Sequence, residues 1–275
     1  METTSIRLLF VIRSESIMVS KLLANYHTHT KRCLHAVGED REYVEKAIEQ
    51  GFQILGFSDH VPWPYKTDFV STVRMTMNEL SNYVESVLRL KEEYKKDIEI
   101  YLGFETEYLP YLYQDLKDKI ADIPYDYMLL GQHFLFSEEN GIYMGAPFTD
   151  EKTLSDYVDT IIEGIQTGDF LYVAHPDIPN YIGAKSIYRT HMTRLCQAVK
   201  ERNIPLEINV VGLRKNRNYP CSRFFEIASE IGNDVVIGVD AHDPLHFASE
   251  DIFVDCINIA KRYQLNLLHS IPMNK

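Results

Sequence analysis

The sequence predicts an α/β fold, a distorted (β/α)7 barrel similar to a TIM barrel, formed by a single domain. Seven short apolar segments alternate with longer amphipathic ones, which is the order of strands and helices in parallel α/β barrels. The turn after the first segment, residues 26–32, holds no glycine, whereas doubly wound sheets usually carry a Gly-rich phosphate loop there. No low-complexity linker or block of charge divides the chain, so one domain is the simpler interpretation.

The predicted strands are short and rich in Val, Ile, Leu, Tyr and Phe, as buried parallel strands are. In chain order they cover residues 22–26, 53–57, 98–104, 127–130, 171–174, 206–210 and 235–239, with 265–269 as a weaker eighth strand. Helical periodicity predicts helices over residues 42–50, 76–94, 150–166, 190–202, 224–231 and 250–262. Gly51 and Gly168 lie just past two of these segments, where helices commonly end.

The composition is that of an ordinary globular protein. Of the 275 residues 45% are apolar and 25% charged, and 40 Asp and Glu outnumber 28 Lys and Arg, for a net charge of −12. This balance argues against nucleic acid as a partner, because phosphate contacts need clustered Lys and Arg. It permits a small anionic substrate, since a metal ion can invert the local charge.

No segment predicts a membrane span or a secreted protein. The longest apolar run near the N-terminus, residues 8–12, is far shorter than the ~20 residues that cross a bilayer. The four cysteines form no C-x-x-C pair and are too sparse for a disulfide scaffold. We therefore expect a cytoplasmic protein. Residues 1–19 are expected to be a disordered extension or the result of a start codon assigned too early, and residues 20–275 to form the barrel.

Histidines and carboxylates follow the predicted strands, at the end of a barrel where functional residues lie. Seven of the ten histidines stand there, together with a glutamate and an aspartate. The nine residues are His27, His29, His35, His60, Glu105, His133, His175, Asp240 and His242. Residues two apart in an extended segment project to the same side, so His27 and His29 can bind one ion. Imidazoles and carboxylates are ligands for Zn, Mn and Fe, and the set predicts a multinuclear metal site.

The number of candidate ligands indicates how many ions are bound. Nine ligands exceed what one tetrahedral ion uses and are too few to enclose two ions fully while leaving open positions. Three divalent ions with about three protein ligands each would leave room for water and substrate, as catalytic sites require. The ligand types do not distinguish Zn, Mn and Fe.

The ordered motifs H-x-H, a third His, D-H, G-x-E, Q-H, A-H-P and D-A-H resemble those of the PHP (polymerase and histidinol phosphatase) metallophosphoesterases, from about residue 26 to residue 242. Segments 56–60, 207–209, 212–214 and 219–220 look like the monofunctional histidinol-phosphate phosphatases of that family. The resemblance implies a distorted seven-stranded barrel and three metal sites. The implied ligands are His27, His29, Glu105 and Asp240 for the first site, Glu105, His133 and His175 for the second, and His35, His60 and His242 for the third.

The resemblance also implies a reaction, the hydrolysis of L-histidinol phosphate to L-histidinol and inorganic phosphate in histidine biosynthesis. A water or hydroxide that bridges two divalent ions has a lowered pKa and would be the nucleophile, held in line with phosphorus. The ions would neutralise charge on the non-bridging oxygens. The candidate catalytic residues are Glu105, Asp240 and His60, and the general acid stays open. The choice of this substrate depends on the resemblance alone.

Basic residues after the fifth and sixth strands are candidates for binding the phosphate group. Arg189 ends a predicted loop, residues 185–189, and Arg214 precedes Lys215 and Arg217. Arginine suits bidentate phosphate contacts better than lysine does. We expect Arg189 and Arg214 to bind phosphate, with solvated loop charges as the alternative.

Other polar and aromatic residues adjoin the predicted ligands. We expect Asp59 and Asp177 to orient neighbouring imidazoles. The imidazole and amine of the substrate would need acidic partners, for which Glu107, Asp177 and Asp243 are candidates. Trp63 and Tyr65 would either stack on a substrate ring or pack onto the barrel.

Three alternatives remain open. An amidohydrolase also begins with H-x-H, but such enzymes typically use a carboxylated lysine or a glutamate as bridge, and here no lysine ends a strand. A phosphoesterase of the same family that acts on another small phosphate or a nucleotide is the closer competitor. A metal-stabilised binding module is disfavoured, because structural zinc sites are usually rich in cysteine.

Overall fold

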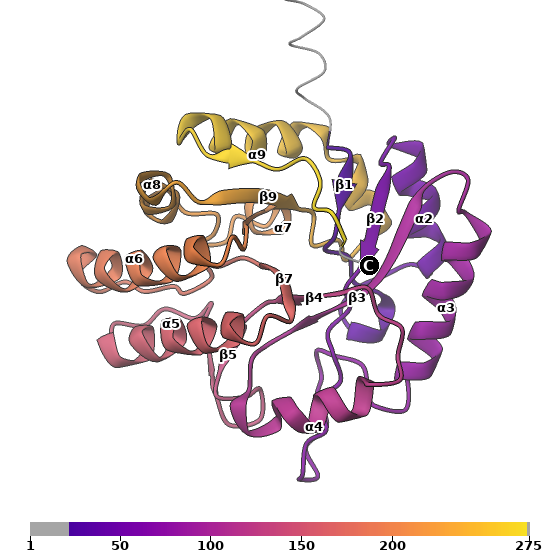
Figure 1. The fold of residues 1–275 in the computed structure, drawn as a ribbon, viewed down its shortest axis with the longest axis horizontal. Coiled ribbons are helices and arrows are strands. Elements are labelled where there is room, and N and C mark those ends of the chain that lie inside the picture. The colour runs from indigo at the N-terminus through magenta and orange to yellow at the C-terminus, as the bar shows by residue number, and fades with distance from the viewer. Residues whose placement is uncertain (1–21, 274–275) are drawn as a thin grey trace, which may run out of the picture.

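Eight parallel strands form one curled sheet, and helices cover its outer surface (Figure 1). The computed structural model describes residues 22–273. The sheet order follows the chain, apart from a separate hairpin of β5 and β6. The strands are β1 (Ala24–Asn25), β2 (Ile54–Phe57), β3 (Glu99–Thr106), β4 (Tyr127–Leu130), β7 (Phe170–Val173), β8 (Leu206–Asn209), β9 (Asp234–Gly238) and β10 (Asn266–Leu267). The predicted α/β barrel of one domain is confirmed, and the weaker eighth strand is present as β10.

The barrel is distorted at the junction between its first and last strands. At the carboxyl end, the segment after β9 pairs with the segment after β1 through a bridge between Thr28 and Ala241. The backbone N–H of His29 donates to the carbonyl of Ala241 at 2.9 Å. At the amino end β10 pairs with β9 instead. Strand β9 therefore has two different neighbours on one side, which brings the residues after β1 and β9 together.

The helices and the hairpin connect successive strands. The helices are α2 (Asp40–Glu49), α3 (Leu80–Glu93), α4 (Pro110–Ile120), α5 (Glu151–Gln166), α6 (Lys185–Glu201), α7 (Val210–Arg214), α8 (Ser222–Ile231) and α9 (Glu250–Arg262). Two 3₁₀ helices, η1 (Lys31–Cys33) and η2 (Pro244–Ala248), follow β1 and β9, and the hairpin of β5 (Phe134–Leu135) and β6 (Ile142–Tyr143) follows β4. All six predicted helices are present; α9 has the predicted bounds, and the other five differ at one or both ends.

Helix α4 and the first part of α6 were not predicted as helices, and both differences have a physical reason. The sequence analysis assigns no helix to residues 110–120, yet α4 begins with Pro110 at its first position and buries Leu112, Leu116 and Ile120. This spacing of four residues is a helical signal that the short length of the segment weakens. The predicted loop 185–189 is the first part of α6, whose N-cap, Ala184, offers no capping side chain.

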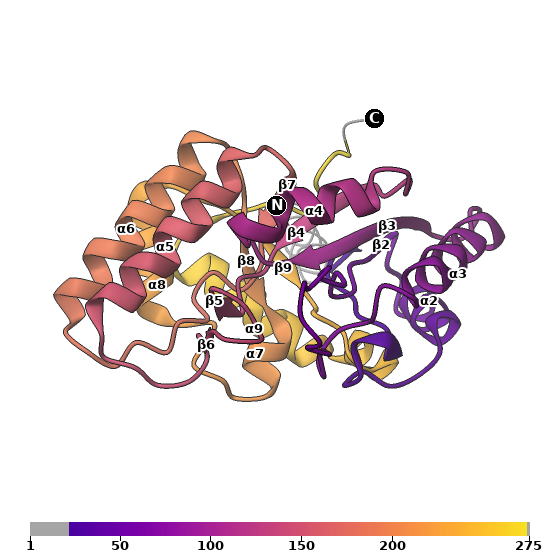
Figure 2. The same ribbon diagram turned by 90° about the horizontal axis from the view of Figure 1, so that it is seen from below.

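Apolar side chains fill two separate cores. The larger core lies between the sheet and the helices. A smaller one fills the amino-terminal half of the barrel interior and includes Tyr26, Tyr127 and Tyr172. The segment after β10 closes this end, since Ile271 packs there and its backbone exchanges two hydrogen bonds, of 2.9 and 3.1 Å, with the hydroxyl of Tyr26. In Figure 2 this yellow segment lies on the side away from β5, β6 and α7.

No helix among residues 22–273 combines the length and the apolar character needed to cross a bilayer. The expectation about residues 1–19 concerns a part of the chain outside the described residues.

Candidate metal centre

The carboxylate of Glu105, at the carboxyl end of β3, lies in the middle of a group of imidazoles. Its side chain is buried, as a carboxylate in a dry interior can be only when it has partners. The Oε2 atom lies within 3.4 Å of a ring nitrogen of His27, His29 and His60. The Oε1 atom lies 2.8 Å from Nε2 of His175 and 3.4 Å from Nε2 of His133. Strands β1, β2, β4 and β7 therefore all deliver a histidine to one carboxylate.

The carboxylate of Asp240, after β9, forms a second centre beside the first. Its Oδ1 atom lies 3.2 Å from Nε2 of His29, 3.6 Å from Nε2 of His27 and 3.3 Å from Nδ1 of His242. The Nε2 atom of His242 in turn faces Nε2 of His35 at 3.0 Å. All nine predicted ligands thus lie in one continuous cluster at the carboxyl ends of the strands.

Among the nine residues, four sets of three ligand atoms lie close enough to share an ion, with the atoms of each set within 4.8 Å of one another. The sets are His27, His29 and Asp240; His27, Glu105 and His175; His29, His60 and Glu105; and His35, His60 and His242. They overlap with the three ligand groups that the sequence analysis assigns. The donors are imidazoles and carboxylates, which suit Zn, Mn and Fe.

Several buried polar atoms of the cluster have no hydrogen-bond partner among the described residues. They include Nε2 of His27, both ring nitrogens of His29, and Oε2 of Glu105. Buried polar atoms are almost always paired, because an unpaired one costs about 1–3 kcal/mol. Bare nitrogens and carboxylate oxygens that face one another are satisfied together by a cation, so the donor set fits divalent metal ions.

The cluster perturbs the protonation of its members. Although burial opposes the charged carboxylates, the surrounding imidazoles hold the pKa values of Glu105 and Asp240 well below their usual range. Burial, together with the neighbouring charge of His29, lowers the pKa values of His60 and His242 well below 6.5. Both carboxylates are therefore anionic and these two imidazoles neutral near pH 7, the forms in which they bind metals.

Two of the cluster residues have a strained backbone. His175 and Asp240 have φ angles of 29° and 54°, in a region that residues other than glycine rarely occupy. Such strain persists only where the surrounding structure holds it, and it gathers at functional sites. Both residues lie two positions past the last residue of a strand, and both belong to the cluster.

Carboxylates outside the set of nine hold two of the imidazoles. The Oδ1 atom of Asp59 lies 3.4 Å from Nδ1 of His29, as the sequence analysis expects. Glu207 on β8, which the sequence analysis gives no role, accepts a hydrogen bond from Nδ1 of His27 at 2.7 Å. Its signal in the sequence is a charged residue inside an apolar strand segment. Asp177 forms no hydrogen bond or ion pair with an imidazole among the described residues, and its Oδ2 atom accepts the backbone N–H of Cys221 at 2.6 Å.

A cavity of about 390 Å³ opens directly over the cluster, within the size range of small-molecule sites. Five of the nine ligands line it: His35, His60, His133, Asp240 and His242. Its walls carry three basic residues and three aromatic ones, namely Arg74, Lys215, Arg217, Phe134, Tyr143 and Tyr219. The cavity therefore combines a candidate metal face, positive charge and aromatic surface.

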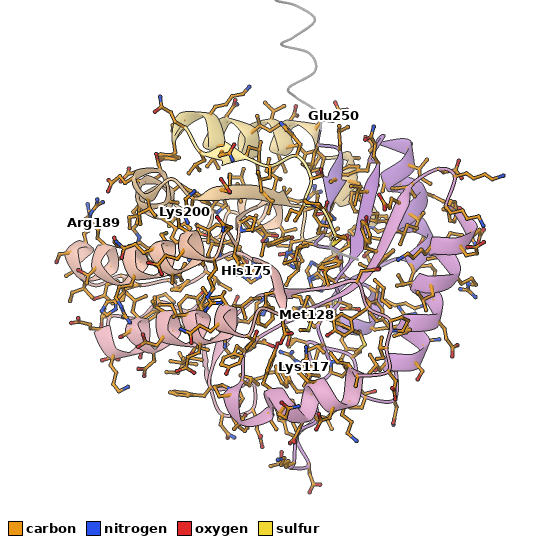
Figure 3. All side chains as sticks on the ribbon, viewed as in Figure 1. Lys117, Met128, His175, Arg189, Lys200 and Glu250 are labelled. Carbon is orange, nitrogen blue, oxygen red and sulfur yellow. The ribbon has the colours of Figure 1, made fainter. Side chains whose placement is uncertain are left out.

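The two arginines that the sequence analysis selects for phosphate lie elsewhere. Arg189, on helix α6, forms an ion pair with Glu230 of α8. Figure 3 shows Arg189 toward the outer end of α6 and His175 near the middle of the molecule. Arg214, at the end of α7, donates to the hydroxyl of Ser249 and does not line the cavity. The sequence analysis selected both because they follow predicted strands, and it assigned residues 185–189 to a loop. In the structure Arg189 lies within α6 and Arg214 is the last residue of α7, and a helix turns successive side chains to different faces.

Arg217 occupies the place expected for these arginines. Its guanidinium donates to the hydroxyl of Tyr143 at 3.1 Å and lies 6.0 Å from the ring centre of Tyr219. No carboxylate among the described residues forms a salt bridge with it. By contrast, the positive charge of Arg74 is neutralised by Glu107 and Glu138, each at 2.9 Å.

The remaining candidates for substrate contacts are occupied by the protein itself. Glu107 accepts hydrogen bonds from Arg74 and from the indole N–H of Trp63, so it has little capacity left for a substrate amine. Trp63 is buried and packs onto the barrel, while Tyr65 is half-buried. Asp243 caps η2 by accepting the N–H of Leu245 at 2.9 Å.

The chain is similar in sequence to a known protein family and to several known proteins. The model of the PHP domain family matches residues 25–210. The chain is 26% identical over 230 residues to the probable histidinol-phosphatase of Deinococcus radiodurans, covering 81% of this chain and 87% of the relative. It is 24% identical over 223 residues to the histidinol-phosphatase of Bacillus subtilis, covering 69% of this chain and 81% of the relative.

A solved structure has the same fold. The histidinol phosphate phosphatase of Lactococcus lactis, solved in complex with zinc, L-histidinol and phosphate, superposes with a TM-score of 0.64 at 18% identity, covering 90% of this chain and 96% of that one. The family match spans most of the chain, from β1 to the start of α7, and includes seven of the nine cluster residues. The protein belongs to the PHP domain family.

Proposed function

We propose that this protein is a metal-dependent phosphomonoesterase that hydrolyses L-histidinol phosphate to L-histidinol and inorganic phosphate. The observation that carries the proposal is the convergence of nine imidazole and carboxylate side chains beneath a cavity with unpaired positive charge. Relatives named histidinol-phosphatase, each matched over most of its length, support this substrate.

Three divalent ions would be held by three of these ligand sets: His27, His29 and Asp240; His27, Glu105 and His175; and His35, His60 and His242. Glu105 and Asp240 are the anionic members. Such ions lower the pKa of bound water and neutralise phosphate oxygens, which is the chemistry that phosphate ester hydrolysis needs. Zn, Mn and Fe all suit these ligands, and the zinc in the Lactococcus lactis structure supports Zn.

The chain's own residues would bind and orient the ester. Arg217 and Lys215 line the cavity, and the guanidinium of Arg217 is held by Tyr143 while its charge stays available for a phosphate oxygen. The aromatic walls of the cavity would exclude water from one side and offer a flat surface to the imidazole of the substrate.

The three candidate catalytic residues would act in defined protonation states. Glu105 and Asp240 stay ionised near pH 7, because their pKa values are well below the usual range, so neither serves as a general acid in that state. His60 stays neutral, since its pKa is lowered, and its Nδ1 atom lies 3.1 Å from Glu105. The three residues would therefore serve chiefly to hold cations and to place the phosphorus beside them.

One observation favours a second candidate substrate class within the same family. Asp240 is the one carboxylate that lines the cavity among the described residues, and it is surrounded by histidines, while Glu107 is saturated by Arg74 and Trp63. A substrate amine thus has few acidic partners. A phosphate ester without an amine, such as a sugar phosphate or a mononucleotide, is the alternative.

Phosphate release from a panel of esters separates these possibilities. The protein would be loaded with Mn or Zn and assayed with L-histidinol phosphate, p-nitrophenyl phosphate and a mononucleotide. His29→Ala removes a central ligand, and His269→Ala changes an exposed histidine after β10 as the matched control. Selective turnover of L-histidinol phosphate, lost only in His29→Ala, is the expected result. Turnover of the other esters alone would overturn the substrate, and no metal-dependent release from any ester would overturn the phosphatase.

A further inference from the structure

Glu207 lies beneath the metal cluster and is fully buried inside the barrel. It is the second residue of β8, two positions before Asn209, so both side chains project from the strand to the interior face. The neighbouring strand leaves room for it only because residue 238 is glycine. A Cβ atom at Gly238 would lie 1.7 Å from Oε1 of Glu207.

The carboxylate of Glu207 is saturated by four hydrogen bonds. Its Oε1 atom accepts from Nδ1 of His27 at 2.7 Å and from the hydroxyl of Tyr172 at 3.2 Å. Its Oε2 atom accepts from the backbone N–H of His175 at 2.9 Å and from Nδ2 of Asn209 at 2.8 Å. A buried carboxylate with this many donors is held rigidly in place.

The two contacts to histidines have different consequences. In the neutral ring, the contact with Nδ1 of His27 favours a proton on that nitrogen and leaves Nε2, which faces Glu105 and Asp240, able to bind an ion. The contact with the N–H of His175 holds a backbone whose φ angle is 29°. Glu207 thus holds both the imidazole of His27, after β1, and the strained backbone of His175, after β7.

The influence of Glu207 reaches Asp240 through Asn209. The Nδ2 atom of Asn209 donates to Glu207 and also, at 3.1 Å, to Oδ2 of Asp240. The Oδ1 atom of Asn209 accepts the N–H of Gly212 and caps α7. No contact joins Glu207 to His35, His60 or His242 among the described residues.

We infer that Glu207 is a positioning residue for four members of the cluster, His27, Glu105, His175 and Asp240. This inference rests on the proposed metal centre. Glu207 holds Nδ1 of His27 and the backbone N–H of His175, so that Nε2 of each ring faces the carboxylates of the cluster. His35, His60 and His242 form no hydrogen bond or ion pair with Glu207 among the described residues, so we expect the ion that they hold to be less affected.

Glu207→Gln tests this role with little change in volume. The amide presents a donor where the carboxylate accepts, so either His27 moves its proton to Nε2 or the N–H of His175 loses its partner. Hydrogen bonds that orient metal ligands commonly change metal affinity by about 10- to 100-fold. We expect Zn²⁺ affinity to fall by about 10- to 100-fold at the sites that include His27 and His175. Zn²⁺ bound by His35, His60 and His242 should be retained.

The measurement is Zn²⁺ bound per chain by elemental analysis after dialysis against buffered Zn²⁺, with the thermal unfolding of the metal-free protein alongside. Asp126→Asn is the matched control, a carboxylate before β4 that accepts the N–H of Leu102 at the other end of the barrel. Partial loss of Zn²⁺ in Glu207→Gln alone supports the role. Unchanged Zn²⁺ content, or loss of all Zn²⁺ with a collapse of metal-free stability, overturns it.

A double-mutant comparison keeps the test decisive if Glu207→Gln folds poorly. Glu207→Asp keeps the charge but draws the carboxylate back by one methylene, and each variant is combined with His27→Ala and with His35→Ala. If Glu207 is a positioning residue, the effects on Zn²⁺ affinity of its substitution and of His27→Ala should be strongly non-additive. The effects of its substitution and of His35→Ala should be additive. Equal coupling with both histidine variants contradicts the role. If the unmodified protein binds no Zn²⁺, the proposed function fails, whereas failure in the variants alone removes only this inference.

Discussion

A Cβ atom at Gly131 would lie 2.0 Å from Oε1 of Glu105, the carboxylate oxygen that faces His175 and His133. Glycine at the end of β4 therefore makes room for the central carboxylate of the cluster. The position of Glu105 thus depends on residue 131 having no side chain.

Gly131→Ala is expected to displace Glu105 and to lower Zn²⁺ affinity and turnover by about 10-fold or more, because five histidines lose a shared partner. Equilibrium dialysis against buffered Zn²⁺ measures the effect. A variant with unchanged Zn²⁺ content and turnover would show that the cluster does not depend on the position of this carboxylate.

Stability of the metal-free protein should depend on pH through His29. Burial alone would lower its pKa, but the neighbouring carboxylates of Asp240, Asp59 and Glu105 raise it from 6.5 to about 9. Protonated His29 therefore stabilises the fold fully below pH 6.5, and this contribution is lost as the pH rises toward 9. We expect the Tm in the presence of a chelator to fall from pH 7 to pH 9, and to fall less in His29→Gln. A Tm that rises over this range contradicts the assignment.

Removal of bound metal should destabilise the protein. Ligands that bind only the folded state add about 2.7 kcal/mol of stability for each site at a free concentration of 100 Kd. A chelator is expected to lower the Tm at pH 7.5, and added Zn²⁺ or Mn²⁺ to restore it. The same treatment should leave the Tm of His29→Ala nearly unchanged, and equal shifts in both proteins would place the stabilising metal elsewhere.

Arg217 and Arg189 offer a matched pair of substitutions. Arg217→Ala removes a charge that lines the cavity, and the loss of one charged hydrogen bond to phosphate should raise KM by about 10- to 100-fold. Arg189→Ala breaks an exposed ion pair with Glu230 and should leave kcat and KM within experimental error. Steady-state kinetics with the preferred ester compares them. A larger effect from Arg189→Ala would restore the original sequence-based choice.

The sequence was informative wherever a local pattern determined the outcome. Apolar runs of four to seven residues predicted the strands, and the residues just after them, such as His27 and Asp240, predicted the cluster, because parallel strands deliver their carboxyl ends to one face. The spacing of residues along the chain did not predict the role of a side chain whose neighbours come from other strands or helices. The start of α6 at Lys185 was missed because no capping side chain marks it, so Arg189 was assigned to a loop. Glu207 was given no role because its partners lie on other strands.

Anomalous diffraction from crystals grown with Zn²⁺ tests the central claim, that the nine residues form a centre for three divalent ions, most directly. Data collected on either side of the zinc absorption edge locate each zinc ion without any measurement of enzymatic activity. We predict three peaks within the cluster: one between His27, His29 and Asp240, one between His27, Glu105 and His175, and one between His35, His60 and His242. Peaks only at surface carboxylates, or none within the cluster, would contradict the claim.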